Sequence, residues 1–426
     1  MSLFALFDIL SAPQVRKRQI RTEARGNLSL LTALLVTPSA IAIVIAIEMV
    51  SVSQERTLMQ AAADAAALAG ARDLMVAGSS QRSATSFAER FAIGQVGDYS
   101  RRARVRFQAR VDKEGEFSID GEAIRPSFFG DLVPPGGFHI RVRAVAENLV
   151  RQPLCILGQN VDTSSNAISG NGTSSVVARG CVVHANGDIV MTNNARIQAG
   201  TVRTSGAIRG GSTDPVANIG ALRITDPFQD RTISPPKPCN KVPDGGTDVW
   251  RTGTLTLRPG MHKTQFVMRG DSVMKLLPGD HYFCSSSFIT ERSRLESQDA
   301  VMLFVDGGLT VRDTATVSLR GRQSGNWAGF VIVTSDTNAA GISFLSRNVD
   351  ELLGTIYMPN SHLLVDAPGN VGEASQWSVI VANRLITSNA AQLVINSQYQ
   401  GSPVPVPVGV GNNVGGANAI PLRLRE

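Results

Sequence analysis

An uninterrupted run of apolar residues near the N-terminus is the strongest feature of the hydrophobic pattern. Residues 28–50 read LSLLTALLVTPSAIAIVIAIEMV and contain one charged side chain, Glu48, close to the end. As an α-helix this run would be about 35 Å long, enough to cross the hydrocarbon core of a membrane. Core helices of soluble proteins rarely extend so far without a polar face, and the run is longer than the apolar region of a cleaved signal peptide. The pattern therefore predicts a transmembrane helix over residues 27–51.

The helical pattern continues beyond this run into an alanine-rich segment, QAAADAAALAGARD, at residues 60–73. Alanine has the highest helix propensity, so the segment can extend the membrane helix without a core of its own. Small side chains let a second helix approach closely. We expect a helix-contact surface for neighbouring helices at Ala62, Ala66, Ala69 and Gly70. A solvated spacer is the alternative.

Alternation of apolar and polar residues begins after residue 100, in ARVRFQARV, EFSID and FHIRVRAVAENLV. Arg141 and Arg143 alternate with Ile140 and Val142, which indicates a sheet with one face in water. We expect a small antiparallel sheet packed on the long helix in the manner of a pilin. Residues 52–150 would then form a helix-plus-sheet stalk.

Residues 151–400 contain short strands separated by Gly, Asn, Asp and Ser. The segments LTLRPGMHK (255–263) and MKLLPGDHY (274–282) share a pattern at an offset of 19 residues. A repeat of this kind favours a right-handed parallel β-helix, with a β-sandwich as the alternative. Residues 401–426 are rich in Pro and Gly and indicate an extended linker or an edge-capping chain. The predicted fold class is α+β, mainly β.

The distribution of charge predicts the orientation of the membrane helix. The net charge is +6, and five basic residues precede the apolar run: Arg16, Lys17, Arg18, Arg21 and Arg25. A basic flank marks the cytoplasmic side of a membrane segment, so we expect residues 1–26 in the cytoplasm and the rest outside it. The same arm is the only feature that favours nucleic-acid binding, and topology already explains it, so we expect no nucleic-acid partner.

All four cysteines follow the predicted membrane helix: Cys155, Cys181, Cys239 and Cys284. An even number in an exported domain indicates two disulfides, which allow three connectivities, and free buried cysteines are the alternative. We favour Cys155–Cys181 and Cys239–Cys284, because each pair is nearest in sequence and could join neighbouring coils.

The N-terminal residues resemble the TadE/TadG-like proteins of bacterial tight-adherence (Flp) pilus systems. The resemblance rests on RGNLSLLTALLVTPSAIAIVIAIEMV followed by QAAADAAALAGARDL, with Gly26, Glu48 and Asp64 at the family's motif positions together with Ala69 and Gly70. It implies an inner-membrane anchor with a periplasmic body and a structural role in Tad pilus assembly. The partners it implies are other Tad assembly proteins or pseudopilins, bound through the N-terminal helix.

Two departures refine this resemblance. Leu31 stands where processed pseudopilins have a glutamate, so we expect an uncleaved anchor. Many TadG-like proteins carry a D-x-S-x-S metal site, and the nearest match here, residues 162–166, lacks the final serine. We therefore expect no metal site.

The candidate chemistry elsewhere in the chain is weak. Asp306 and Asp313 bracket the turn and strand GGLTVR, and Asp366 lies in another candidate rung. Nothing in the sequence brings these carboxylates together as a catalytic pair, and Asp in DGG is an ordinary turn residue. His262 and His281 occupy matching places in the repeat, where we expect stacked surface residues on adjacent rungs, since zinc would need further ligands. We expect no catalytic residues and no cofactor. An envelope-anchored β-helix that binds or cleaves polysaccharide is the alternative function.

Overall fold

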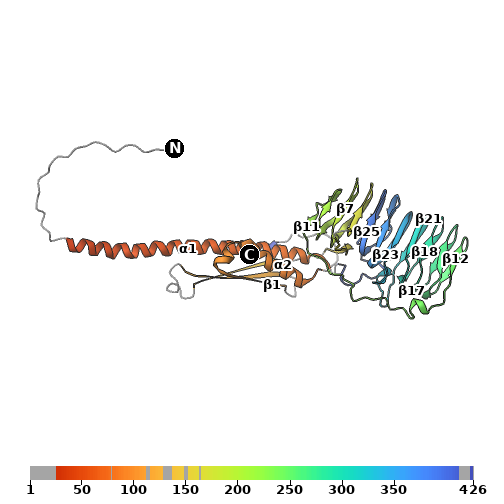
Figure 1. The fold of residues 1–426 in the computed structure, drawn as a ribbon, viewed down its shortest axis with the longest axis horizontal. Coiled ribbons are helices and arrows are strands. Elements are labelled where there is room, and N and C mark those ends of the chain that lie inside the picture. Colours follow the sequence, from red (N-terminus) through yellow and green to blue (C-terminus); the bar gives the residue numbers. More distant parts are fainter. Residues whose placement is uncertain are drawn as a thin grey trace.

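The computed structural model describes residues 25–77, 79–111, 116–127, 137–147, 152–162, 165–411 and 423–425. The chain forms an elongated body in which one long helix leads through a small stalk into a large β-domain (Figure 1). The predicted cytoplasmic arm lies outside the described residues, apart from the first turn of the helix.

Helix α1 (Arg25–Leu74) is one continuous rod of 50 residues. Pro38 lies within it and Ser39 Oγ donates to the Leu35 carbonyl at 2.7 Å, so the local polar groups stay bonded. Among the described residues, one helical stretch, Leu34–Leu74, is long and apolar enough to cross a membrane by length and composition. Large apolar side chains are exposed along its first half: Leu34, Leu35, Val36, Ile41, Ile43, Ile45, Ile47, Met49 and Val50.

The stalk packs two short helices and a small antiparallel sheet against the second half of α1. Its elements are α2 (Gln81–Val96), α3 (Tyr99–Arg102), β1 (Arg104–Val111), β2 (Phe117–Arg125), β3 (Phe138–Glu147) and β27 (Arg423–Arg425). The predicted alternation is present, because one sheet face buries Phe107, Phe117 and Ile119 while Arg141 and Arg143 stay in water. Strand β27 pairs with β3, so the C-terminal end of the chain returns to the stalk.

The large domain is built from short parallel strands. The N-terminal portion contains β4 (Leu154–Gly158), β5 (Ile168–Gly170), β6 (Ser175–Ala185), β7 (Ile189–Met191), β8 (Arg196–Thr204), β9 (Ile208–Arg209), β10 (Ser212–Asp214) and β11 (Asn218–Ile219). The C-terminal portion contains β12 (Thr247–Trp250), β13 (Thr254–Leu257), β14 (Gly260–His262), β15 (Gln265–Met268), β16 (Val273–Leu276), β17 (Gly279–Phe283), β18 (Ser287–Ile289), β19 (Arg294–Ser297), β20 (Ala300–Phe304), β21 (Leu309–Arg320), β22 (Phe330–Thr334), β23 (Ile342–Val365), β24 (Gly369–Val371), β25 (Ser378–Thr387) and β26 (Ala391–Val394). A 3-10 helix, η1 (Cys239–Lys241), lies between them.

Each strand from β12 to β18 pairs in parallel with the third strand after it, which makes the domain a three-sided solenoid. In other coils longer strands, such as β21 and β23, continue around the corners and occupy more than one side. We call its sides the first face (β12, β15, β18), the second face (β13, β16, β19) and the third face (β14, β17, β20). The strand segments of the other coils continue these faces: β24, β26 and the first halves of β6 and β8 lie on the second face, and β4 and β22 lie on the third. The predicted repeat is found in the register of β13 and β16, where Leu255 pairs with Met274. Parallel pairing of successive coils is incompatible with an antiparallel β-sandwich, so that alternative is wrong.

The solenoid is discontinuous in sequence. The chain enters at β4 in the middle of the stack and coils towards the stalk as far as β11. Residues 220–246 then connect to β12 at the far tip, and the later coils return until β25 pairs with β4 and β5. The last coil is completed by β26 on β6. Sequence periodicity shows neither the entry point nor this closure.

The third face is apolar on its outside as well as its inside. Its outward side chains, among them Leu157, Phe330 and Trp377, form a buried cluster with Phe228 of the connection and Val404 of the tail. Trp377 Nε1 donates to the Val404 carbonyl at 3.2 Å. Residues 220–246 and the tail therefore cover this face, whereas the first and second faces are open to water.

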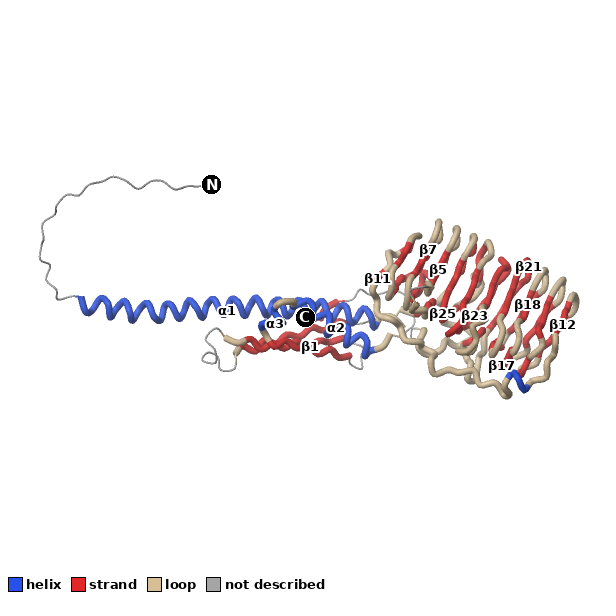
Figure 2. The backbone as a smooth tube through the Cα atoms, viewed as in Figure 1, coloured by secondary structure: helices blue, strands red, loops and turns tan. Residues whose placement is uncertain are grey.

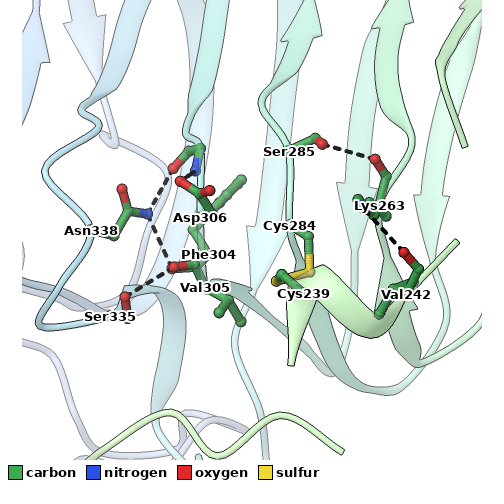
Figure 3. Close-up of a disulfide and its surroundings, with 11 residues drawn as sticks. Cys239, Val242, Lys263, Cys284, Ser285, Phe304, Val305, Asp306, Ser335 and Asn338 are labelled. Atoms are coloured by element: carbon green, nitrogen blue, oxygen red, sulfur yellow. Dashed lines mark hydrogen bonds between the residues drawn. A yellow bond between two sulfur atoms is a disulfide. The ribbon is translucent and has the colours of Figure 1, made fainter. Parts of the chain in front are cut away.

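Both favoured disulfides are present. Cys155–Cys181 joins β4 to β6 in neighbouring coils. Cys239–Cys284 joins η1 in the connection to the end of β17, so it ties the connection to a coil and does not join two coils (Figure 3). Lys263 Nζ donates to the Val242 carbonyl at 3.0 Å beside it. The connection is thus fixed covalently and by hydrogen bonding.

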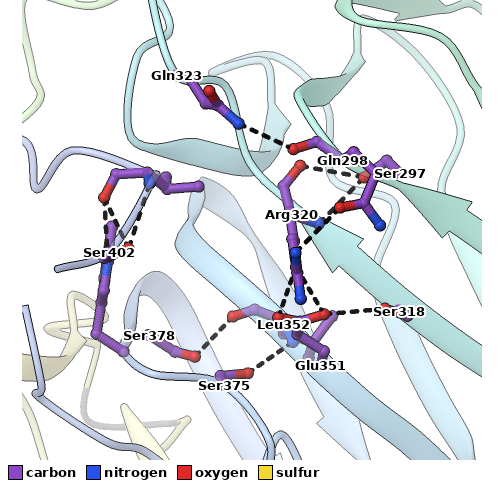
Figure 4. A network of polar contacts seen from close by, with 12 residues as sticks. Ser297, Gln298, Ser318, Arg320, Gln323, Glu351, Leu352, Ser375, Ser378 and Ser402 are labelled. Atoms are coloured by element: carbon purple, nitrogen blue, oxygen red, sulfur yellow. Dashed lines mark hydrogen bonds and ion pairs between the residues drawn. The ribbon is translucent and has the colours of Figure 1, made fainter.

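The second face carries a ladder of polar side chains (Figure 4). Glu351 accepts from Ser318 Oγ at 3.0 Å and from Arg320 Nε at 2.9 Å. Arg320 also donates to Gln298 Oε1 at 3.1 Å, which extends the ladder by one coil. Parallel stacking places side chains from successive coils close together, so their polar groups bond to one another.

Candidate functional site: the stalk and its joint with the solenoid

The alanine run lies inside the stalk. Ala62 and Ala66 are 2% and 0% exposed and belong to one buried cluster with Ala84, Ala88 and Ala92 of α2. Alanines on both helices allow α1 and α2 to approach closely. Helix α2 of the same chain packs beside α1 in the stalk (Figure 2). A solvated spacer does not describe the buried surface that contains Ala62 and Ala66.

Gly70 permits the closest approach in the stalk. A Cβ atom added there would lie 2.3 Å from Cζ of Phe117, whose ring is fully buried. Ala69, one residue earlier, is only half-buried. Two of the four predicted contact positions, Ala62 and Ala66, are thus buried in the cluster that includes α2. Gly70 faces Phe117 of the sheet, and Ala69 lies at the margin.

The three family-motif residues, Gly26, Glu48 and Asp64, have different surroundings in the structure. Gly26 lies in the first turn of α1, and Glu48 is 3% exposed within a stretch whose neighbours are exposed. Asp64 accepts a hydrogen bond from Gln60 Nε2 at 2.8 Å. The same Gln60 nitrogen donates to the Arg143 carbonyl at 2.9 Å, so Asp64 orients a side chain that ties α1 to β3.

A second tie lies closer to the predicted membrane segment. Arg125 at the end of β2 forms an ion pair with Glu55 of α1 at 3.3 Å, and both side chains are largely buried. Burial, followed by the neighbouring Glu55 carboxylate, raises the pKa of Tyr99 to about 12. The stalk is therefore locked to α1 from Glu55 to Gly70.

The stalk meets the solenoid through a buried ion pair between Asp73 and Arg203. Asp73 is in the last turn of α1 and Arg203 is in β8; their side chains are 11% and 6% exposed. Burial lowers the pKa of Arg203, and the Asp73 carboxylate opposes that shift. A buried charge whose partner is removed is costly, so neither residue can be replaced singly without loss.

Backbone and apolar contacts surround this ion pair. Gln152 N donates to the Met75 carbonyl at 2.7 Å, and Gln152 Oε1 accepts from Thr201 Oγ1 at 2.8 Å. Val76 and Ala77 belong to the same buried cluster as Leu154 on the third face. The joint is thus a packed interface with hydrogen bonds. The sequence analysis did not identify Asp73 and Arg203 as a pair. The only sequence signal for this contact is the charge of Asp73 at the end of the alanine-rich segment.

The candidate carboxylates come from different elements: Asp306 follows β20, Asp313 lies within β21, and Asp366 follows β23. Asp306 accepts from Gly307 N at 2.8 Å, Asp313 from Glu291 N at 3.2 Å, and Asp366 bonds Asn389. In the described part of the chain, no hydrogen bond or ion pair joins any two of these three. Each carboxylate therefore has a local structural partner.

The two histidines of the repeat do stack, with ring centroids 5.3 Å apart and His262 Nε2 at 3.1 Å from His281 Nδ1. His281 is 0% exposed, so the expectation of surface residues is wrong for it. Burial, with a smaller effect of His281, lowers the pKa of His262 to about 4. Of the D-x-S-x-S match, Thr163 and Ser164 lie outside the described residues. Within the described residues there is no group of three or more His, Cys, Asp or Glu that could hold a metal ion.

These elements define a helix-anchored stalk that carries a β-solenoid. Residues 26–73 match the family described as "Putative Flp pilus-assembly TadE/G-like", which confirms the resemblance of the N-terminal helix region. No curated protein matches the chain. One solved structure that aligns is "Crystal structure of an ice binding protein from an Antarctic Biological Consortium", with 13% identity over 60% of this chain and 96% of that one. Its TM-score of 0.25 is too low to support any conclusion.

Proposed function

We propose that the protein is a membrane-anchored structural component of Tad (Flp) pilus assembly. The observation that carries this proposal is the single helix α1, which holds the family-matching residues 26–73 and ends in the Asp73–Arg203 joint. In this proposal α1 crosses the inner membrane once, with the N-terminus in the cytoplasm. The two disulfides support a periplasmic location for the solenoid, because disulfides persist in oxidising compartments.

Contacts with other Tad proteins or pseudopilins would use the first half of α1. The alanine run is covered by α2 and the sheet, whereas Ile43 and Met49 are 60% and 64% exposed. In a membrane these apolar side chains face lipid or another helix. The solenoid, which we expect to be right-handed, would act without catalysis as a body held at a fixed place relative to α1.

A site-specific photocrosslinker tests this role. Placed at Ile43, it should give adducts with other Tad proteins in membranes of a strain that makes the pilus. The matched control is the same group at Val249, a 48% exposed position in β12 at the far tip of the solenoid, which should give none. A reporter active only outside the cytoplasm, fused after Glu426, should also be active. Absence of Ile43 adducts, or a cytoplasmic C-terminus, would refute the proposal.

A further inference from the structure

A polar groove opens on the second face where the solenoid closes on itself. It has a volume of about 470 Å³ and lies over β6, β8 and β26. After Val394 the chain leaves the stack, and Ser397 bridges back to Trp377 in antiparallel fashion. The regular coil is therefore interrupted at this point. Such a break creates a concavity on an otherwise flat face, in the volume range of small-ligand sites.

The groove combines an apolar floor with polar walls. Val394 pairs with Val177, so their side chains lie side by side, and both are partly exposed. Gln198 continues this row in the next coil. Gln392 lies at the other margin, where its Oε1 accepts from Ser175 Oγ at 3.5 Å. Valine side chains suit the apolar face of a sugar ring, and amides suit its hydroxyl groups.

Two guanidinium groups give the groove its charge. Arg179 and Arg196 are both exposed, and in the described part of the chain neither forms an ion pair. Arg179 reaches Gln198 Oε1 at 3.4 Å, which leaves most of its donors available. Among the described residues that line the groove, Glu373 is the one acidic residue, and its side chain bonds Asn370. Guanidinium groups bind carboxylates with two parallel hydrogen bonds.

We propose that this groove binds a carboxylated glycan, with sugar rings over Val177 and Val394 and carboxylates on Arg179 and Arg196. A neutral glycan would leave both guanidinium groups without a counterion. The site concerns the solenoid surface and is independent of the pilus role of α1. It gives the alternative function, polysaccharide binding, a specific location.

Titration of the full chain in detergent with tetragalacturonate, followed by calorimetry, tests the site. Binding should weaken at least tenfold in Arg179→Gln/Arg196→Gln. It should stay within twofold in the control Arg258→Gln/Arg347→Gln, which removes two exposed arginines elsewhere on the solenoid. Neutral maltotetraose should bind at least tenfold more weakly than tetragalacturonate.

Three outcomes would overturn the proposal. The first is no saturable binding by the unmodified chain. The second is equal loss in the groove variant and its control, which would mean that overall charge attracts the anion. The third is equal affinity for maltotetraose and tetragalacturonate, which would show that the carboxylates do not contribute to binding. Unchanged tryptophan fluorescence in both double variants would show that the solenoid is still folded.

Discussion

Replacement of Gly70 tests whether the stalk packs as tightly as the structure shows. A Cβ atom at this position would lie 2.3 Å from Phe117 Cζ and 2.6 and 2.7 Å from the two Cε atoms. Alanine in place of glycine gains about 1 kcal/mol of helix propensity. A methyl group forced into a filled core costs about 1–3 kcal/mol, and the buried ring cannot move into solvent. We therefore expect Gly70→Ala to lose up to about 2 kcal/mol and Gly70→Leu more than about 3 kcal/mol.

Urea unfolding of the full chain in detergent measures this loss. The helical far-UV circular dichroism reports on the stalk, whereas all three tryptophans, Trp250, Trp327 and Trp377, report on the solenoid. Only the unfolding transition detected by circular dichroism should shift. Ala61→Leu, at an exposed position of the same helix, is the control and should stay within about 0.5 kcal/mol. A gain of about 1 kcal/mol in Gly70→Ala would show that helix propensity prevails and would refute the packing argument.

Three further variants test the joint, the histidine pair and the connection. Asp73→Ala should weaken the joint by about 3–5 kcal/mol and expose it to limited proteolysis. The control Asp98→Ala, which removes a largely exposed ion pair, should have no such effect. The pKa of His262 is depressed to about 4 from 6.5, so its contribution to stability is present above pH 6.5 and is lost as the pH falls towards 4. His262→Gln should therefore reduce the acid-dependent loss of stability measured by tryptophan-detected unfolding. An unchanged pH profile of stability would contradict this expectation. Loss of the Cys239–Cys284 disulfide, by reduction or in Cys239→Ser/Cys284→Ser, should lower the free energy of unfolding of the solenoid. The loop-entropy model gives about 4 kcal/mol for the sequence separation of 45. The same unfolding curves measure this loss, and unchanged curves would contradict the expectation.

Local patterns predicted the elements well but not what they contact. The apolar run, the alanine run and the alternation around Arg141 depend on residues close in sequence, and each forms the expected helix or strand. The small side chain of Ala66 indicated close helix contact. Sequence could not say that the partner is α2 of the same chain, because packing partners are chosen by the whole fold.

The pairing that closes the solenoid, between β25 and the strands β4 and β5, could not be predicted from the sequence either, because it also depends on the whole fold. Leu385 pairs with Ile168, and no repeat offset links residues so far apart along the chain. The groove that contains Arg179 arises from this closure, so it was missed as well. In contrast, the offset of 19 residues placed His262 and His281 in neighbouring coils, because that contact follows the local repeat.

The joint explains how the solenoid keeps its direction relative to α1. The chain crosses from stalk to solenoid between β3 and β4 and returns between the third face and β27. The buried Asp73–Arg203 ion pair and the packing of Val76 oppose rotation about the long axis, since turning the solenoid would separate a desolvated charge pair. An element fixed in this way can hold a binding surface at a set distance and direction from the membrane helix.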